Sequence, residues 1–597
     1  MPRSPSSRDA KGTTNRTIES IAAMRVFDAF RNYNRRFGEL TRRTARHFET
    51  GDRSSGRADA VRRIELYNKS VAAVIQNLRT WPRDVIESRD CWSRIKVNYV
   101  DLIADCADAE FYKTFFSSVT RRIFDTVGVD PSVEFLAIEI EPDSAEKYPL
   151  RTRRYTNRGS LNYLFDEMLG DLPFARRFRD LDATLSFIAA EIDAYREEEG
   201  IEADPHTVEV IPPLFYRGRR AYLVGRLLGD GWQVPLVIPF ANPPDGIFVD
   251  AVILTENDVS MLFGFTTSYF HVDLPVVGSA VRFLRELLPK KPLEEIYTVL
   301  GRAKQGKTER YRSLMKHMDQ STDLFVRAPG AAGMVMEVFT LPSFNVVFKV
   351  IRDRFKYPKT IRPEEVKQKY ELVFKHDRAG RLVDAQEFRR LSFAADRFES
   401  RLLDGLLQEC ANSCSLQGDQ LLIEHLYIER RLTPLNVFMQ TADRESGGAA
   451  IIDYGQAVRD LASSNIFAGD LLLKNFGLTR HGRVIFYDYD EVCSVTDCNF
   501  RPLPQSDRLE DEMSAEPWFF VAPSDIFPEE FIRFLGLDAE LEQFFRHYHD
   551  DLLSHEWWNR IKARLEGGEM IEVLPYSART RTTKLSGAGL YTSRKRL

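Results

Sequence analysis

Two hydrophobic patterns follow one another in the first half of the chain. From about residue 18 to 120, apolar residues recur every three or four positions, the spacing that gives a helix a single apolar face. This pattern predicts long packed helices, with the polar segment 51–59 as a loop between two of them. One such stripe consists of Val61, Ile64, Tyr67, Val71, Val74, Ile75 and Leu78.

Between residues 207 and 272 the apolar residues gather in short continuous runs. The runs AYLVGRLL and WQVPLVIPF are separated by Gly229-Asp230-Gly231. Glycine and aspartate are typical of the tight turn that joins two paired strands. We therefore expect a β-hairpin within this otherwise mostly helical half.

A second mixed region begins near residue 320. Short β-like runs at 323–327, 334–341 and 345–351 precede a helix that Pro363 opens, since proline suits the first turn of a helix. Another β-like run lies at 483–491. Apolar stripes predict two helices here, one with Val366, Tyr370 and Val373 and one with Ile451, Tyr454, Val458 and Leu461.

These patterns predict an α+β protein in four segments. Residues 1–17 are rich in Ser, Thr and Arg without periodicity, so we expect a disordered leader. Residues 18–319 are expected to form a mostly helical domain with a β-hairpin region, and 320–576 a second, mixed domain. The tail 577–597 has basic residues and no acidic one, and is expected to be solvated.

Composition and charge exclude several classes of protein. The 597 residues are 43% hydrophobic and 29% charged, a globular composition with no disordered or collagen-like bias. Basic and acidic residues nearly balance, with a net charge of -5, so the chain lacks the overall positive charge of a general nucleic-acid-binding protein. Because no run of about 18 apolar residues occurs and no apolar region follows the basic N-terminus, we expect a cytoplasmic protein with no membrane or nucleic-acid partner.

The cysteines do not form a recognisable metal or redox motif. No two of them have the two-residue gap of a zinc knuckle or a redox pair. We expect reduced thiols, mostly in the core. They are Cys91, Cys106, Cys410, Cys414, Cys493 and Cys498.

The first candidate chemistry is a small-residue loop followed by a lysine. The loop lies between two strand-like runs, where small residues let backbone N–H groups approach phosphate oxygens closely. Lys349 follows its last glycine by sixteen residues, within the apolar run NVVFKVI, and a lysine there must reach water or an anion. The loop consists of Ala328, Pro329, Gly330, Ala331, Ala332, Gly333 and Met334.

The stronger signal is a set of three polar residues downstream. Asp470 and Asn475 are separated by four residues, and Asp488 follows the next strand-like run. In a protein-kinase site the first Asp orients the substrate hydroxyl, while the Asn and the later Asp hold magnesium on the phosphates. Together with the loop and Lys349, the set predicts phosphoryl transfer from ATP.

Two departures from the protein-kinase pattern leave alternatives open. Asp470 follows Phe467-Ala468-Gly469 instead of His-Arg, and Asp488 precedes Tyr489-Asp490-Glu491 instead of Phe-Gly. The Gly-Asp pair before Asn475 also occurs in small-molecule kinases of the aminoglycoside phosphotransferase type. A third reading is a pseudokinase that binds nucleotide without transferring phosphate.

Several longer segments resemble the bacterial isocitrate dehydrogenase kinase/phosphatase family. They include RAPGAAGMVMEVFTLPSFNVVFKVIRDRF, HDRAGRLVDAQEF, LYIERRLTPLN, NIFAGDLLLKNFGLTRHGRVIFYDYDE and EPWFFVAPSDIFPEEF, with RGRRAYLVGRL and FGFTTSYFHVDLP in the first half. The resemblance covers most of the chain and is weakest at its termini. It implies an N-terminal regulatory domain followed by a two-lobed, protein-kinase-like domain.

The resemblance also implies an activity. Such a protein phosphorylates a serine of isocitrate dehydrogenase and removes the phosphate again at the same nucleotide site, which sets carbon flow between the citric acid cycle and the glyoxylate bypass. The expected ligands are ATP, Mg²⁺ and AMP as allosteric effector. By motif, Lys349 and residues 328–334 hold ATP, Asp470 is the catalytic acid, and Asn475 and Asp488 bind magnesium. Asp384 and Asp490 match acids that the family associates with the phosphatase activity.

Overall fold

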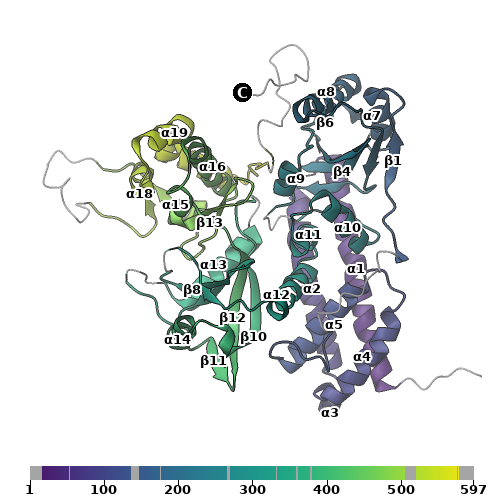
Figure 1. Cartoon of the computed structure of the whole chain (residues 1–597), viewed down its shortest axis with the longest axis vertical. Helices are drawn as coiled ribbons and strands as arrows, with labels where there is room; N and C mark the ends of the chain where they lie inside the picture. The colour runs from purple at the N-terminus through teal and green to yellow at the C-terminus, as the bar shows by residue number, and fades with distance from the viewer. Residues whose placement is uncertain are drawn as a thin grey trace, which may run out of the picture.

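Two halves of the molecule lie side by side and meet at helix α12 (Ala303–Gln320) (Figure 1). The expected leader (1–17) and basic tail (577–597) fall outside the described residues, except for Thr17. The computed structural model describes residues 17–574 and 576, apart from 53, 136–146, 175–176, 265–268, 331–332, 358, 360, 377–379 and 505–518.

Long helices build one end of the N-terminal half, as expected. Thr17 caps the first of them by accepting a hydrogen bond from the Ser20 N–H, and Gly51, at φ +71°, ends it. The helices are α1 (Ile18–Thr50), α2 (Ser54–Leu78), α3 (Arg83–Ile86), α4 (Arg89–Ile103) and α5 (Ala109–Phe124).

Two details of the expected helix packing are wrong. Helix α2 begins at Ser54, so the loop expected over 51–59 is shorter. Val61 and Ile64 are 45% and 42% exposed, because the inward face of α2 instead carries Arg63, which is 4% exposed. The Arg63 guanidinium donates to the carbonyls of Phe270 and Leu300 and thereby replaces the apolar contacts that the stripe predicted.

The expected hairpin is present at the centre of a larger antiparallel sheet. Gly229 pairs with Trp232 across the turn, where Gly231 has φ +78°. The strand order is β1-β2-β4-β5-β6, with β3 pairing β4. The strands are β1 (Arg153–Thr156), β2 (Thr207–Val210), β3 (Phe215–Arg217), β4 (Arg220–Gly229), β5 (Trp232–Ala241) and β6 (Phe248–Val249).

Helices cover both faces of this sheet. Side chains alternate along a strand, so Val224 packs into the core of α1–α5 while Leu223 packs into a second core with α7 and α8. The helices are α7 (Leu161–Gly170), α8 (Leu181–Glu199), α9 (Glu256–Leu262), α10 (Val277–Leu287) and α11 (Leu293–Val299).

The C-terminal half has the expected two lobes, of which the first is a sheet. Its strand order is β10-β12-β9-β8-β7, with β11 pairing β12. Helix α12 packs on it, since Leu314 and Met318 share a core with Phe348. The elements are β7 (Val326–Arg327), β8 (Met336–Leu341), β9 (Phe344–Ile351), α13 (Pro363–His376), β10 (Gln386–Ala394), α14 (Ser400–Glu409), β11 (Cys414–Gln417) and β12 (Gln420–Arg430).

The second lobe is mostly helical and carries a small sheet of order β13-β14-β15. Both predicted apolar stripes, on α13 and on α16, are buried as expected. The elements are β13 (Thr433–Pro434), α15 (Leu435–Phe438), α16 (Arg444–Ser463), β14 (Phe476–Leu478), β15 (Val484–Phe486), β16 (Asn499–Phe500), β17 (Asp525–Ile526), α18 (Phe531–Leu535), α19 (Ala539–His549) and α20 (His555–Glu566).

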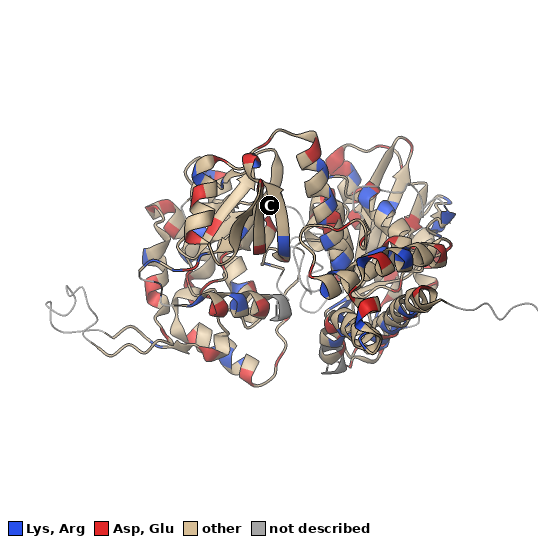
Figure 2. Cartoon of the chain, turned by 90° about the horizontal axis from the view of Figure 1, so that it is seen from below, with Lys and Arg blue, Asp and Glu red and all other residues tan. Residues whose placement is uncertain are grey.

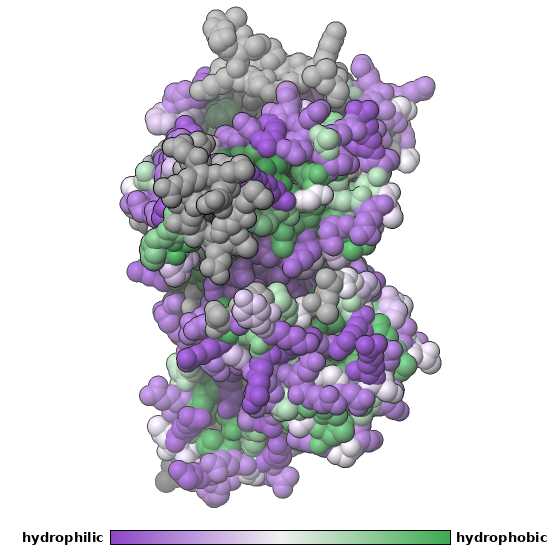
Figure 3. All heavy atoms as spheres, turned by 90° about the vertical axis from the view of Figure 1, so that its left-hand side faces the viewer, coloured by the Kyte–Doolittle hydropathy of each residue, from purple (hydrophilic) through white to green (hydrophobic). Residues whose placement is uncertain are grey.

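The surface carries charges of both signs. Basic and acidic residues are interspersed over both halves (Figure 2). On the face formed by the C-terminal half, hydrophilic side chains dominate and hydrophobic ones occur in smaller areas between them (Figure 3). Within the described part of the chain, no helix has the length and apolar character needed to cross a membrane. All six cysteines are free thiols, and four of them are buried, as expected.

Candidate active site

Strand alternation explains why Lys349 points toward the second lobe. Its neighbours Phe348 and Val350 are fully buried in the core that includes α12, so Lys349 lies on the opposite face of β9. It is 6% exposed, and its Nζ donates to the Tyr487 carbonyl at 2.8 Å. The predicted phosphate lysine therefore reaches the residue that precedes Asp488.

A buried glutamate that the sequence analysis missed pairs with this lysine. Lys349 Nζ lies 2.7 Å from Glu429 Oε2, and Glu429 is 1% exposed. Lys349 lies opposite Tyr427 in the sheet, so Glu429 is its diagonal neighbour on the same face. Burial raises the pKa of Glu429, and the charge of Lys349 opposes that rise.

In protein kinases the partner of this lysine comes from a helix. Here it comes from β12, within the segment LYIERRL. The signal that could have revealed it is a single acidic residue at an inward position of a strand.

The small-residue loop joins β7 and β8, as expected. The Ala328 N–H donates to the Val338 carbonyl, which closes the base of the loop. Gly330 has φ +115°, a conformation that L side chains rarely adopt. A Cβ on Gly333 would lie 3.0 Å from the Met336 carbonyl oxygen. The Ala331 and Ala332 positions lie outside the described residues.

Asp470 and Asn475 share one short loop between α16 and β14. The Asp470 carboxylate accepts a hydrogen bond from the Leu472 N–H at 3.0 Å. The Asn475 side-chain amide donates to the Asp470 carbonyl at 3.2 Å, and the Asn475 carbonyl accepts from the Tyr487 N–H at 3.1 Å. Asn475 thus connects the Asp470 loop to the Asp488 segment.

Gly469 fits this loop because no side chain would. It has φ +77°, and a Cβ there would lie 2.5 Å from the Glu491 carbonyl oxygen. The close approach brings the segment that follows Asp488 against the residue that precedes Asp470. The departure from the His-Arg of protein kinases therefore has a structural reason at Gly469, the residue directly before Asp470.

Asp488 lies among other charged groups at the centre of the set. Burial and the neighbouring Asp490 raise the pKa of Asp488 to about 7, against the lowering effect of Lys349 and Lys359. Asp470 also raises it. A carboxyl group whose pKa is shifted this far by its surroundings is typical of a functional site. A bound cation would stabilise the ionised form of this carboxylate.

Asp384 and Asp490 have different surroundings. Asp384 Oδ2 accepts from the Gln386 amide at 2.9 Å and lies 3.7 Å from Arg310 Nη2, and burial raises the pKa of Asp384. Asp490 pairs with Lys359 Nζ at 2.9 Å. Arg310 belongs to α12 and is 3% exposed. Sequence patterns do not reveal Arg310, because nothing local marks a helix residue that reaches the next domain.

The described residues fit magnesium held together with a nucleotide. No group of three or more His, Cys, Asp or Glu side chains in the described segments has the arrangement of a self-sufficient metal site. Mg²⁺ in phosphoryl-transfer sites takes only one or two protein carboxylates and completes its shell with water and phosphate. Asp488 and the Asn475 amide oxygen supply donors of that kind.

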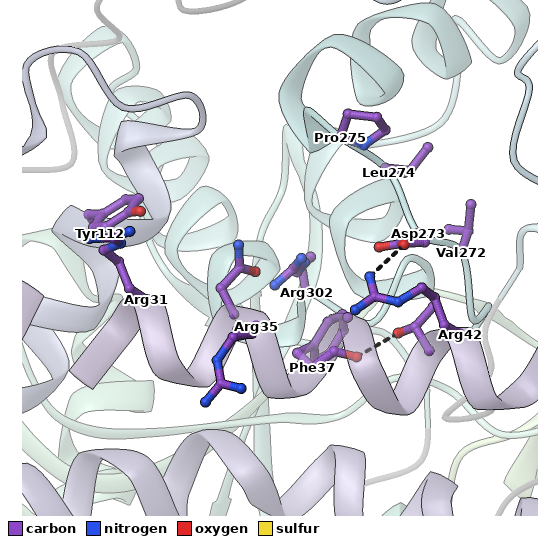
Figure 4. Close-up of a pocket in the computed structure, with 13 residues that line it drawn as sticks. Arg31, Arg35, Phe37, Arg42, Tyr112, Val272, Asp273, Leu274, Pro275 and Arg302 are labelled. Atoms are coloured by element: carbon purple, nitrogen blue, oxygen red, sulfur yellow. Dashed lines mark hydrogen bonds and ion pairs between the residues drawn. The ribbon is translucent and has the colours of Figure 1, made fainter. Parts of the chain in front are cut away.

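The N-terminal half contains two cavities that meet at Arg302. One, of about 390 Å³, is lined by Arg31, Arg42, Tyr112 and Asp273, and Arg42 pairs with Asp273 at 2.8 Å (Figure 4). The lining of the other, of about 220 Å³, includes five aromatic side chains as well as Arg63 and Lys304. The Arg302 guanidinium stacks over Phe37, 4.1 Å from the ring centroid, and lines both.

Comparison with known proteins covers both halves of the chain. Residues 23–322 match the model of the isocitrate dehydrogenase kinase/phosphatase regulatory domain, and residues 323–578 match that of the kinase domain of the same family.

Similar full-length proteins bear the same family name. Isocitrate dehydrogenase kinase/phosphatase of Xanthomonas euvesicatoria pv. vesicatoria is 45% identical over 557 residues, which are 93% of this chain and 96% of that protein. The protein of that name from Anaeromyxobacter sp. (strain Fw109-5) is 43% identical, over 94% of this chain and 97% of its own length. The chain therefore belongs to the isocitrate dehydrogenase kinase/phosphatase family.

Proposed function

We propose that this chain phosphorylates a serine of isocitrate dehydrogenase with ATP and hydrolyses the same phosphoserine, and thereby controls flux between the citric acid cycle and the glyoxylate bypass. Family membership over nearly the whole chain supports the substrate and both reactions. The observation that carries the chemistry is the convergence of Lys349, Asn475 and Asp470 on the segment Tyr487–Asp488. The proposed domains are 18–319 and 320–576, and the proposed location is the cytoplasm.

In the kinase reaction the serine Oγ attacks the γ-phosphorus of ATP and the bond to the β–γ bridging oxygen breaks. Asp470 orients the hydroxyl and accepts its proton. Lys349, fixed by Glu429, binds phosphate oxygens below the loop 328–334. Magnesium held by Asn475 and Asp488 would supply positive charge to the phosphate oxygens. The chain retains the phosphate lysine, the catalytic acid and both magnesium ligands of a kinase, which argues against a pseudokinase. These residues are Lys349, Asp470, Asn475 and Asp488.

In the phosphatase reaction water attacks the phosphorus of phosphoserine, and the serine leaves as the alcohol. A carboxylate must orient that water and take its proton. Asp384 and Asp490 are the proposed carboxylates. Burial raises the pKa of Asp384 and so brings that pKa closer to neutral pH, which suits a general base.

AMP is the proposed effector of the regulatory domain. An anionic nucleotide needs cations for its phosphate and an apolar surface for its base. The two cavities that meet at Arg302 offer both kinds of lining. Equilibrium binding of AMP to the full-length protein, and its weakening in Arg302→Gln, would support this location; AMP binding that Arg302→Gln leaves unchanged would contradict it.

One experiment separates the candidate activities. The protein is incubated with γ-labelled ATP, magnesium and purified isocitrate dehydrogenase, and then chased with unlabelled ATP and AMP. Label on a dehydrogenase serine that the chase removes supports the proposal. Label on a small metabolite instead would indicate the small-molecule kinase. ATP binding without transfer to any acceptor would indicate the nucleotide-binding scaffold.

A further inference from the structure

Two cysteine thiols touch each other just beyond the candidate active site. Cys493 Sγ and Cys498 Sγ are 3.6 Å apart and flank a single turn of 3₁₀ helix, η4 (Val495–Asp497). A disulfide has an S–S distance of about 2.05 Å, so the two sulfur atoms need to approach by only about 1.5 Å. Of the six cysteines, all of which lie in described segments, this is the one pair that forms a sulfur–sulfur hydrogen bond.

The two thiols have different surroundings. Cys493 is partly exposed, whereas Cys498 is 3% exposed. The hydrogen bond between the two thiols lowers the pKa of Cys493, and the nearby charge of Lys369 lowers it further, against the effect of burial. The same contact and burial raise the pKa of Cys498. Cys493 is thus the thiol that an oxidant reaches first, and Cys498 lies in position to react with the oxidised sulfur.

We propose that Cys493 and Cys498 form a site of reversible oxidative modification by hydroperoxides. The Cys493 thiolate attacks one peroxide oxygen, the O–O bond breaks, and with hydrogen peroxide a sulfenic acid and the first water result. The Cys498 sulfur then attacks the sulfenic sulfur, the S–S bond forms, the S–O bond breaks and a second water leaves. Two thiols lose two electrons and two protons, and the peroxide is reduced to water. A small dithiol then reduces the disulfide by thiol–disulfide exchange and restores both cysteine thiols.

The turn between the two cysteines is hydrogen-bonded directly to the loop between α16 and β14, which carries Asp470 and Asn475 and is called the catalytic loop below. The Cys493 N–H donates to the Phe467 carbonyl at 3.0 Å, and the Phe467 N–H donates back to the Cys493 carbonyl at 2.8 Å. The Thr496 N–H also donates to the Asn465 side chain at 3.1 Å. Residues 465–467 lead into Gly469 and Asp470, so a shift of Cys493 reaches the residue proposed to orient the serine.

The other end of the turn is anchored to the body of the second lobe. The Cys498 carbonyl accepts from Lys562 Nζ of α20 at 2.7 Å. Closing the disulfide against this anchor displaces the Cys493 side of the turn. Since a displacement of about 1 Å near reacting groups can cost up to about 10²-fold in rate, we expect kinase turnover to fall about tenfold on oxidation. That expectation rests on the proposed function, whereas disulfide formation does not.

The test uses the full-length protein and reads the modification by mass. The protein is treated with hydrogen peroxide, free thiols are alkylated, and the peptide that contains both cysteines is weighed with and without prior reduction. The expected result is loss of two hydrogens and no alkylation at either cysteine, reversed by dithiothreitol. Two alkylated cysteines after treatment, or sulfinic acid at Cys493 without a disulfide, would overturn the proposal.

Variants connect the modification to activity. Cys498→Ser should abolish the reversible loss of kinase turnover, whereas Cys106→Ser, which removes a partly exposed thiol elsewhere, should not. If Cys498→Ser fails to fold, Cys493→Ser serves, because its side chain is partly exposed. Turnover that stays unchanged when the disulfide is complete would refute the link to the catalytic loop. Failure of the reduced protein to phosphorylate isocitrate dehydrogenase would refute the proposed function and leave the mass result standing.

Discussion

Lys349 and Glu429 form a buried ion pair between neighbouring strands, with 2.7 Å between Nζ and Oε2. The pair fixes the lysine within one sheet, so its position does not depend on a mobile helix. In protein kinases, by contrast, the helix that carries the glutamate must be placed correctly before the site is active. We therefore expect the lysine of this protein to be in place before any ligand binds.

Glu429→Gln tests this role of the ion pair. The variant keeps the size of the side chain but removes its charge, so Lys349 loses its ion pair while it keeps its hydrogen bond to the Tyr487 carbonyl. We expect kcat for phosphoryl transfer to fall and the free energy of unfolding to drop by about 1–3 kcal/mol, as for other losses of a buried charged hydrogen bond. Lys349→Met is the matched variant and should abolish transfer. A Glu429→Gln variant with the same kcat and melting temperature as the wild-type protein would argue against a role of Glu429 in positioning Lys349.

The pKa of Asp488 predicts a pH-dependent stability. Its ordinary value of 3.8 is raised to about 7 in the folded protein, mainly by burial. Between these values the folded state keeps a proton that the unfolded chain releases, so this group stabilises less as the pH rises toward 7. Asp488→Asn should therefore gain melting temperature relative to wild type between pH 5 and pH 8, both assayed without magnesium. A constant difference between the two proteins across that range would refute the raised pKa.

Magnesium binding should depend on the same group. A cation needs the ionised form of Asp488, so we expect the affinity for Mg²⁺ and ATP to increase as the pH rises through about 7, with release of a proton on binding. Calorimetry in two buffers of different ionisation enthalpy measures that proton. Binding with no proton release at pH 6.5 would speak against Asp488 as a ligand.

Gly469→Ala should damage both stability and transfer. The left-handed backbone alone costs about 1–2 kcal/mol for a residue with a Cβ, and here that Cβ would also lie 2.5 Å from the Glu491 carbonyl oxygen. Gly482→Ala is the control, because it has a similar φ of +72° with no atom within 4 Å of the added Cβ. We expect a clearly larger loss of unfolding free energy in Gly469→Ala. Equal losses in chemical denaturation would show that the close approach does not matter.

Asp384→Ala and Asp490→Ala test the division of labour between the two reactions. Either change should reduce phosphatase turnover more than kinase turnover, because only hydrolysis needs a carboxylate for water. Asp490→Ala also removes one of the two carboxylates that pair with Lys359, the other being Glu491, so the melting temperature of this variant must be measured alongside. Equal loss of both activities in both variants would reject the assignment.

Local sequence signals were sufficient for much of the fold. Gly229-Asp230-Gly231 placed the hairpin, and Pro363 marks the first residue of α13. The spacing of Asp470, Asn475 and Asp488 identified residues that the structure brings together, because Asp470 and Asn475 precede the paired strands β14 and β15 and Asp488 follows them.

Long-range relationships were not predictable in the same way. Glu429 meets Lys349 through the register of β12 against β9, and Arg310 of α12 meets Asp384 across 74 residues of sequence. The outward turn of Val61 and Ile64 likewise depends on Arg63, whose partners lie more than two hundred residues away. Periodicity reports which residues share a face, but it does not report which face meets a partner.

Arg310 also has a consequence for attempts to divide the protein. Its guanidinium contributes to the electrostatic environment of Asp384 and donates to the Ile428 carbonyl at 3.2 Å, yet it lies before residue 323, where the match to the kinase domain begins. A fragment cut at that boundary would leave an acid and a carbonyl without their cation. A fragment that contains the catalytic domain therefore keeps all the charged groups around Asp384 only if it also includes helix α12, the last helix of the N-terminal half.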